Sequence, residues 1–255
     1  MVDTARKSHF SCKPSIGARA QVYAPNFSEQ VTSSVWLVVP AYNEQSTIEQ
    51  VVLGLLRFCP NVAVIDDCSS DLTPIRARAA GARVLRHPIN LGQGASLQTG
   101  IDFALQNGAS HIVSFDADLQ HRPEDIPLLL RALTETGADF ALGSRFLGKA
   151  NNIDLSRKLL LKAAVLFTRL TIGLKLTDVH NGLRAMTRRG AGALRIRQNR
   201  MAHASEMLQQ IAKSGLPYIE VPVTVEYTSY SKAKGQRLSN SVNIVLELLT
   251  GALKR

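Results

Sequence analysis

The sequence predicts an α/β protein built on an open, mostly parallel β-sheet flanked by helices. Short, almost wholly apolar runs alternate with stretches of helical periodicity, as in parallel sheets buried on both faces. The 255 residues suffice for one large domain, and no Ser/Gly/Pro-rich linker divides them. We expect an irregular tail at 1–34, the main domain at 35–230, and a basic loop with an amphipathic helix at 231–255.

The first elements follow a strand–helix–strand–helix order. A strand is predicted at 35–39, where an apolar run meets Pro40. Ser46 and Glu49 match a capping box and predict a helix with apolar residues at 48, 51, 52 and 55 on one face. A second strand is predicted at 62–66. The pair Thr73-Pro74, which fits an N-cap and a first-turn proline, predicts a helix to 80.

The same alternation continues to residue 142 and then loosens. Strands are predicted at 82–86, 111–115 and 138–142, with helices at 91–106 and 123–136. Further helices are expected at 156–172, 204–214 and 240–253. The segment 218–227 alternates and contains Pro222, which is typical of an edge strand. No apolar stretch reaches the roughly 18 residues of a membrane-spanning helix.

Charged or polar side chains are expected at the ends of successive strands. Because parallel strands present their carboxyl ends at one edge of a sheet, these side chains should share one mouth, where such sheets bind ligands. They are Asp66, Asp67, Arg86, Asp116, Asp118, Ser144 and Arg145.

The acidic run Phe115-Asp116-Ala117-Asp118-Leu119-Gln120 is the strongest candidate site. Two carboxylates separated by one residue at a strand end suit Mg²⁺ or Mn²⁺, and Gln120 offers a third oxygen. Such a cation would stabilise a departing diphosphate. The alternative is a loop whose carboxylates only cap the next helix.

Three further turns suit a nucleotide, and each also has a purely structural interpretation. Tyr42 and Glu44 follow the first strand and would hold a base and ribose, or open the next helix. A carboxylate of the adjacent Asp66 and Asp67 would accept the imino N–H of uracil or guanine; the alternative is a cap for the next helix, which Ser70 or Asp71 could provide alone. The small residues of 90–95 would let backbone approach a nucleotide, or simply start a helix.

Composition narrows the partners. The net charge of +10 favours a polyanionic partner such as nucleic acid, anionic lipid or a phosphorylated substrate. No stacking aromatic platform or nucleic-acid motif is present, so we expect no nucleic acid. The three cysteines form neither a zinc motif nor a disulfide framework, and no apolar signal core opens the chain, so a cytoplasmic protein is predicted.

Together, in this order and spacing, the four motifs resemble family 2 glycosyltransferases with the GT-A fold, over 35–227. The run 116–120 followed by Pro123-Glu124 is similar to the dolichol-phosphate mannosyltransferase and polyprenyl-phosphate glycosyltransferase branch. The resemblance implies Mg²⁺ or Mn²⁺ held by Asp116, Asp118 and Gln120. It also implies a nucleoside pocket lined by Pro40, Tyr42, Glu44 and Asp67 and flanked by Asn90, Gly92 and Ala95.

The resemblance also implies that arginines meet the donor and acceptor phosphates. Arg145, Arg157 and Arg184 match the branch's motifs, the last within a D-x-x-x-G-x-R run that begins at Asp178. Arginine forks fit phosphate oxygens, but an ion pair with a nearby carboxylate is the alternative for each. Two departures are Cys68, where glycine is usual, and His180-Asn181, which replaces a Thr-Ser pair.

A general base is not assigned from the sequence. An acceptor phosphate is already anionic at neutral pH, since its second pKa is about 6. If a base is needed, Asp178 and Glu206 are the candidates. Glu206 would otherwise position substrate or a loop bearing basic residues.

Two amphipathic helices suggest contact with a membrane. Lys158, Lys162 and Arg169 form a stripe beside a broad apolar face on the helix at 156–172, which suits a bilayer interface. The helix at 240–253 is similar, and Lys232 belongs to a basic loop suited to closing over phosphates. The alternative for both helices is domain core or the seam of a homo-oligomer.

The resulting prediction is a peripheral enzyme of the cytoplasmic membrane face. It would move a sugar with inversion from a UDP- or GDP-sugar to a polyprenyl phosphate. One alternative keeps the donor but uses a soluble saccharide or protein acceptor. Two others are a non-catalytic nucleotide-sugar sensor and a nucleic-acid-binding protein.

Overall fold

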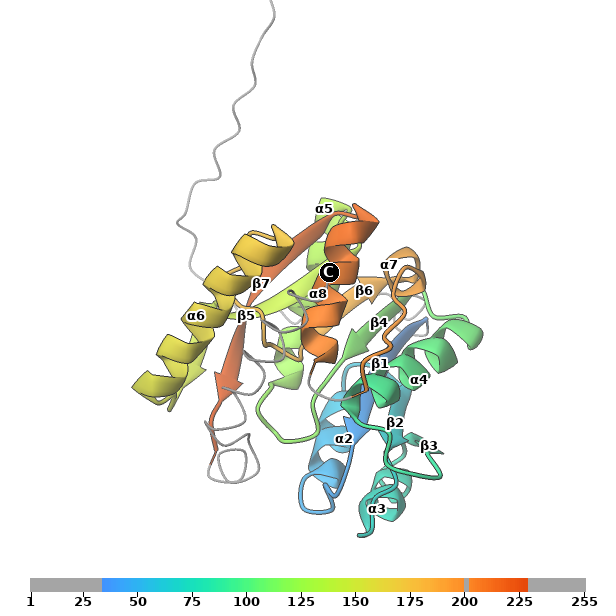
Figure 1. Cartoon of the computed structure of the whole chain (residues 1–255). Helices are drawn as coiled ribbons and strands as arrows, with labels where there is room; N and C mark the ends of the chain where they lie inside the picture. The colour runs from blue at the N-terminus through green and yellow to red at the C-terminus, as the bar shows by residue number, and fades with distance from the viewer. Residues whose placement is uncertain (1–33, 200–201, 229–255) are drawn as a thin grey trace, which may run out of the picture.

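The computed structural model describes residues 34–199 and 202–228 (Figure 1). The predictions for the tail before Ser34 and for 231–255, including Lys232, fall outside these residues. None of the helices within them is both long and apolar enough to cross a bilayer.

A seven-stranded sheet runs through the described residues in the order β3-β2-β1-β4-β6-β5-β7. All neighbouring pairs are parallel except those of β6, which is antiparallel to β4 and β5. The predicted mostly parallel sheet is therefore confirmed. The strands are β1 Val35–Ala41, β2 Val62–Asp66, β3 Arg83–Arg86, β4 His111–Ser114, β5 Phe140–Asn151, β6 Arg184–Thr187 and β7 Tyr218–Glu226.

Helices cover both faces of the sheet (Figure 1). Alternation along β1 explains the two layers, since Leu37 and Val39 point to one core and Trp36 and Val38 to the other. The first core includes α2 Ile48–Leu56, α3 Thr73–Ala79 and α5 Ile126–Thr136, which follows the 3₁₀ turn η1 Pro123–Asp125. The second includes α4 Gln93–Gln106, α7 Arg188–Gly192 and α8 His203–Ser214, with α6 Leu155–Ile172 at its margin.

Most predicted elements are present, but two helix starts were wrong in detail. The capping box of Ser46 and Glu49 does not form, because Thr47 is the N-cap of α2 and makes no side-chain cap. Its hydroxyl instead donates to Glu44 Oε2 at 3.0 Å. Thr73 is the first residue of α3 rather than its N-cap, and its hydroxyl accepts the Glu44 N–H at 2.7 Å.

Pro40 opens the sheet at one end. The pairing of β1 with β4 stops at Val38 and Ser114, while pairing with β2 continues to Ala41 and Asp66. The Val38 carbonyl accepts the Phe115 N–H on the β4 side, and the proline nitrogen two residues later faces the same side without a hydrogen to donate. Pairing between β1 and β4 therefore ends before β1 does, and the residues after β4 leave the sheet at the end of these strands.

Candidate active site

The predicted mouth forms at the carboxyl ends of the parallel strands. Asp66 and Arg86 end β2 and β3 and pair with an Arg86 Nε to Asp66 Oδ2 distance of 3.1 Å. Antiparallel β6 begins where β4 ends, with Ser114 opposite Arg184. The loop before β6 therefore joins the mouth, a contribution that the sequence pattern did not predict.

The acidic turn after β4 has a strained backbone. Leu119, between Asp118 and Gln120, has a φ of +62°, which is unusual for a bulky side chain, and its side chain packs against the core. The Gln120 N–H donates to Asp118 Oδ1 at 3.1 Å. Asp116, Asp118 and Gln120 are all half-buried, while Ala117 is buried. Strain held in place by packing at a mouth is typical of a functional turn.

The two carboxylates of this turn titrate differently. For Asp116, burial opposes ionisation and is the largest influence, but the hydrogen bond from His121 and the charges of His121, Arg184 and His203 outweigh it and lower its pKa. For Asp118, burial and then the charge of Asp116 raise the pKa to about 6. The pair thus repels itself at a half-buried site, and a cation would relieve the repulsion.

The donor set fits Mg²⁺ or Mn²⁺ bound together with a substrate. Two carboxylates and one amide oxygen are hard ligands, and Mg²⁺ usually takes one or two carboxylates plus substrate phosphates. In the described part of the chain, no three His, Cys, Asp or Glu side chains form a metal cage. Gly182 lies against Asp116 so closely that a β-carbon there would be 2.0 Å from Oδ2. A glycine is therefore required behind the carboxylate.

Hydrogen bonds join the turns after β1 and β2, where the nucleoside pocket was predicted. Asn43, with a φ of +52°, donates its N–H to Ser69 Oγ at 2.9 Å and accepts the Ser70 N–H at 3.0 Å. Tyr42 is 46% exposed beside Pro40, whereas Glu44 is buried at the start of α2. The predicted residues Pro40, Tyr42 and Glu44 therefore lie at one rim of the mouth. Glu44 makes its contacts with Thr47 and Thr73, at the starts of α2 and α3.

Asp67 holds the 90–92 turn. Its Oδ1 accepts the Leu91 N–H at 2.9 Å, its Oδ2 accepts the Gly92 N–H at 2.6 Å, and the Asn90 amide donates to its carbonyl at 3.2 Å. His87 Nδ1 lies 2.8 Å from Oδ1. Buried Asp67 therefore shapes the rim of the predicted nucleoside pocket from beneath. His87 was not predicted, because nothing in its spacing marks it.

The first turn of α4 is closed by the chain itself. The Gly94 N–H donates to the Asn199 carbonyl at 2.8 Å, and a β-carbon on Gly94 would lie 2.0 Å from the Gln198 oxygen. The small residues at 90–95 were predicted to let a nucleotide approach the backbone. At Gly94, the backbone instead contacts the segment 195–199 of the same chain. Ala95, next along, is half-buried.

Arg145 is engaged by protein groups. Its Nε donates to Asp178 Oδ2 at 2.6 Å, and its other nitrogens donate to the Tyr227 hydroxyl and, at 2.6 Å, to the His180 carbonyl. Burial opposes the charge of Arg145, yet Asp178 and Tyr227 outweigh it and raise its pKa. The ion pair that was the alternative interpretation of Arg145 is therefore present.

The other two predicted arginines sit nearby. Arg184 is buried; burial is the largest influence and lowers its pKa, against the charges of Asp116 and Asp178. Arg157 is half-buried in the first turn of α6, with its guanidinium carbon 5.0 Å from the centre of the Tyr227 ring. Arg184 is thus on the side of the mouth where the acidic turn lies, and Arg157 is on the α6 side.

Glu206 clamps a loop. Its two oxygens accept the N–H groups of Arg197, at 3.0 and 3.2 Å, and of Gln198, at 2.8 Å. Gln210, one turn later on α8, accepts the Arg195 N–H at 2.6 Å and donates to the Arg195 carbonyl at 2.6 Å. Of the roles predicted for Glu206, positioning a loop with basic residues matches this geometry.

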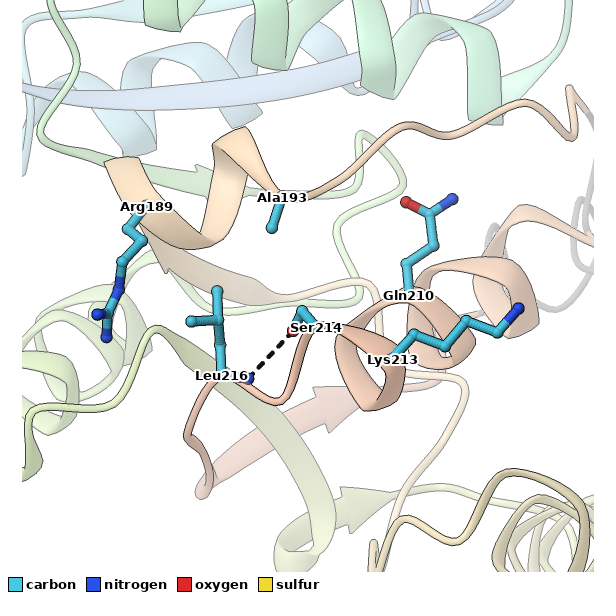
Figure 2. A pocket seen from close by; sticks show the side chains of 6 residues that line it. All are labelled: Arg189, Ala193, Gln210, Lys213, Ser214 and Leu216. Atoms are coloured by element: carbon cyan, nitrogen blue, oxygen red, sulfur yellow. Dashed lines mark hydrogen bonds between the residues drawn. The ribbon is translucent and has the colours of Figure 1, made fainter.

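A separate hollow lies at the opposite edge of the sheet. Its volume is about 520 Å³, and it is lined by residues of α7, α8 and the turn after α8, among them Arg189, Gln210 and Lys213 (Figure 2). The two cations point apart, and Arg189 is paired with Asp139. This hollow does not belong to the mouth.

An open, mostly parallel sheet with a D-x-D turn at the end of a central strand defines the GT-A class of glycosyltransferases. The pattern of Glycosyl transferase family 2 matches residues 36–194. The chain belongs to this family.

Several characterised relatives match most of the chain. The UDP-N-acetylglucosamine–dolichyl-phosphate N-acetylglucosaminyltransferase of Methanococcus voltae is 30% identical, over 84% of this chain and 94% of the relative. The undecaprenyl-phosphate mannosyltransferase of Micrococcus luteus is 34% identical, over 74% and 82%. Glucosyl-3-phosphoglycerate synthase of Mycobacterium tuberculosis, crystallised with Mn²⁺ and UDP, superposes with a TM-score of 0.66 at 21% identity, over 90% of this chain and 84% of that one. The last likeness bears on the fold alone.

Proposed function

We propose that this protein transfers a sugar from a UDP- or GDP-sugar to a polyprenyl phosphate at a membrane surface, with Mg²⁺ or Mn²⁺ bound at the mouth. The observation that carries the donor half is the acidic turn. Its carboxylates, Asp116 and Asp118, are half-buried, mutually repelling and backed by a glycine that leaves room for nothing else. With Gln120 they would hold the cation, which supplies charge compensation for the leaving diphosphate.

The acceptor half is supported by the state of the two candidate bases. Asp178 Oδ2 accepts hydrogen bonds from both the N–H and the Nε of Arg145, and both oxygens of Glu206 accept N–H groups of the 197–198 backbone. A hydroxyl acceptor needs a base to take its proton. A phosphate monoester is already ionised at neutral pH. Its oxygen attacks the anomeric carbon from the face opposite the diphosphate, the bond to the diphosphate breaks, and no proton has to leave.

The membrane contact is proposed from α6. Leu155, Leu159, Leu166 and Leu170 repeat along one stripe and are 73, 61, 59 and 77% exposed. Lys158, Lys162 and Arg169 run beside them. The relatives named above act, by name, on dolichyl and undecaprenyl phosphates. An apolar stripe edged by cations suits an anionic bilayer. Arg157, near the mouth, would meet a lipid-borne phosphate beside this helix.

A panel of acceptors tests the acceptor half. The purified protein is given radiolabelled UDP- and GDP-sugars with Mn²⁺ and either a polyprenyl phosphate or the matched polyprenol. Transfer is expected to the phosphate and not to the alcohol, because the alcohol would need a base. Faster transfer to a soluble saccharide or protein would overturn the assignment of the acceptor.

Thermal unfolding tests the donor half independently. A nucleoside diphosphate with Mn²⁺ at about 100 times its Kd should raise Tm by about 5–10 °C. The increase should be base-selective and should disappear in Asp118→Ala. An equal shift in wild type and variant would contradict the proposed metal ligands.

A further inference from the structure

His121, directly after the acidic turn, is buried without an evident structural reason. Its side chain is 3% exposed, and its Nε2 lies 3.2 Å from Asp116 Oδ2. Its ring meets Phe115 edge-on, with centroids 5.9 Å apart. Among the described residues, its Nδ1 has no hydrogen-bond partner. One nitrogen is thus used on Asp116, and the other is buried and unsatisfied.

That arrangement costs stability. A buried polar atom without a partner destabilises the folded state, and an apolar side chain of similar size would avoid this cost. Because an ionised carboxylate only accepts hydrogen bonds, the hydrogen must be on Nε2. The contact with Asp116 is therefore the feature that accounts for a histidine at this position.

The contact fixes how the Asp116 carboxylate faces. Oδ2 is held by His121, Oδ1 lies 3.3 Å from the donor Nε2 of Gln93, and Gly182 closes the space behind. Donors that orient a metal-binding side chain from outside its coordination shell commonly set metal affinity.

His121 is itself firmly held by β7. Its backbone forms a β-bridge with Val225, the Glu226 N–H donates to the Gln120 carbonyl at 2.8 Å, and the Thr224 N–H donates to Asp125 Oδ2 at 2.8 Å. Tyr227, which directly follows β7, is the residue whose hydroxyl accepts a hydrogen bond from Arg145. The strand that holds the acidic turn in place therefore leads directly to a partner of Arg145.

We propose that His121 is a positioning residue, which holds Asp116 in the orientation that binds the divalent cation. This inference rests on the proposed function. The family resemblance implied roles for Asp116, Asp118 and Gln120 but none for His121.

A matched pair of variants tests it. His121→Gln keeps an N–H donor near the position of Nε2, whereas His121→Met has a similar length and no donor. The readout is Mn²⁺ affinity in the presence of UDP or GDP, from the loss of the free-ion signal in electron paramagnetic resonance. The Met variant is expected to bind Mn²⁺ about 10–100-fold more weakly, and the Gln variant to recover most of that loss.

Circular dichroism and Tm establish that both variants are folded. Wild-type affinity in His121→Met would overturn the inference, as would equal losses in the Gln and Met variants, which would assign the effect to the ring rather than to its N–H. If His121→Met does not fold, the donor-free His121→Leu replaces it in the same comparison. Failure of the wild-type protein to bind Mn²⁺ would instead overturn the metal site of the proposed function, and the inference with it.

Discussion

Gly182 has no room for a side chain beside Asp116. Replacing it by alanine places a carbon 2.0 Å from Asp116 Oδ2, so the carboxylate must move. We expect Gly182→Ala to weaken Mn²⁺-dependent nucleotide binding by at least about tenfold, the scale of a lost orienting contact. Isothermal titration calorimetry measures the change. Gly192→Ala, where a β-carbon meets open space, is the control. Unchanged binding in Gly182→Ala would mean that Asp116 is not a ligand.

His180 makes the protein sensitive to acid. Burial lowers its pKa from 6.5 to about 4, so the folded state keeps it neutral while the unfolded chain takes up a proton. The unfolded state then binds more protons, and the free energy of unfolding should fall by up to about 3 kcal/mol as the pH drops through this window.

Urea unfolding of wild type and His180→Thr at about pH 7 and about pH 5 isolates this effect. The variant should lose less stability on acidification. Other groups titrate in the same window, Asp118 with the opposite sign, so only the difference between the two proteins is informative. Parallel profiles would show that His180 is protonated in the fold.

The spacing of charged residues along the chain predicted which side chains share the mouth, but not what each one contacts. Asp67 and Arg145 were expected at the mouth and lie there, yet both are engaged by protein partners. Their partners, Gly92 and Asp178, are 25 and 33 residues away in sequence. Such pairings depend on tertiary packing, which local patterns do not contain.

At the scale of elements, the sequence predicted all the strands of the described sheet except β6, and it ended β5 at residue 142 rather than at Asn151. The four residues of β6 include Arg184, and both of its neighbours come from distant parts of the chain. The outer half of β5 is half-buried or exposed and pairs only with β7. A four-residue strand that begins with a buried arginine and a partly exposed strand extension both lack the buried apolar run by which a strand is recognised in a sequence.

Helix α8 gives a test of whether Glu206 is a base or a clamp. An amide offers one acceptor oxygen where the carboxylate offers two, so Glu206→Gln should loosen the 197–198 backbone and lower Tm. A lost general base costs about 10²–10⁴-fold in kcat, whereas a loosened loop should cost less than about tenfold. Kinetics with the polyprenyl phosphate acceptor distinguish these. Glu49→Gln, on the exposed side of α2, is the control. A loss above about 100-fold at unchanged Tm would favour a base.

At the scale of the molecule, the first turn of α6 lies beside the mouth. The helix starts just after β5, whose partner strand β7 leads to Tyr227, and Arg157 stacks on that ring. A protein resting on a bilayer through the leucines of α6 would therefore bring Arg157, beside the mouth, close to lipid headgroups.

Vesicle binding tests this orientation. Leu159→Ser with Leu166→Ser should weaken binding to phosphatidylglycerol-containing vesicles by about tenfold or more, since burial of each leucine contributes about 1.5 kcal/mol or more. Cosedimentation measures the loss, and Tm should not change because both leucines are exposed. Leu53→Ser changes a leucine on α2 that is 51% exposed, and this control should bind as wild type. Wild-type binding by the α6 variant would exclude this helix as the contact.

Pro222 has a consequence for self-association. In the described residues β7 is an outermost strand, and proline there removes one of the hydrogen-bond donors that a docking strand would use. The other outermost strand, β3, is only four residues long. Two copies are therefore poorly suited to fuse their sheets into one continuous ribbon. If this enzyme forms dimers, they should be joined through helices. Pro222 on β7 and the short length of β3 should also disfavour the strand-to-strand association that leads to fibrils.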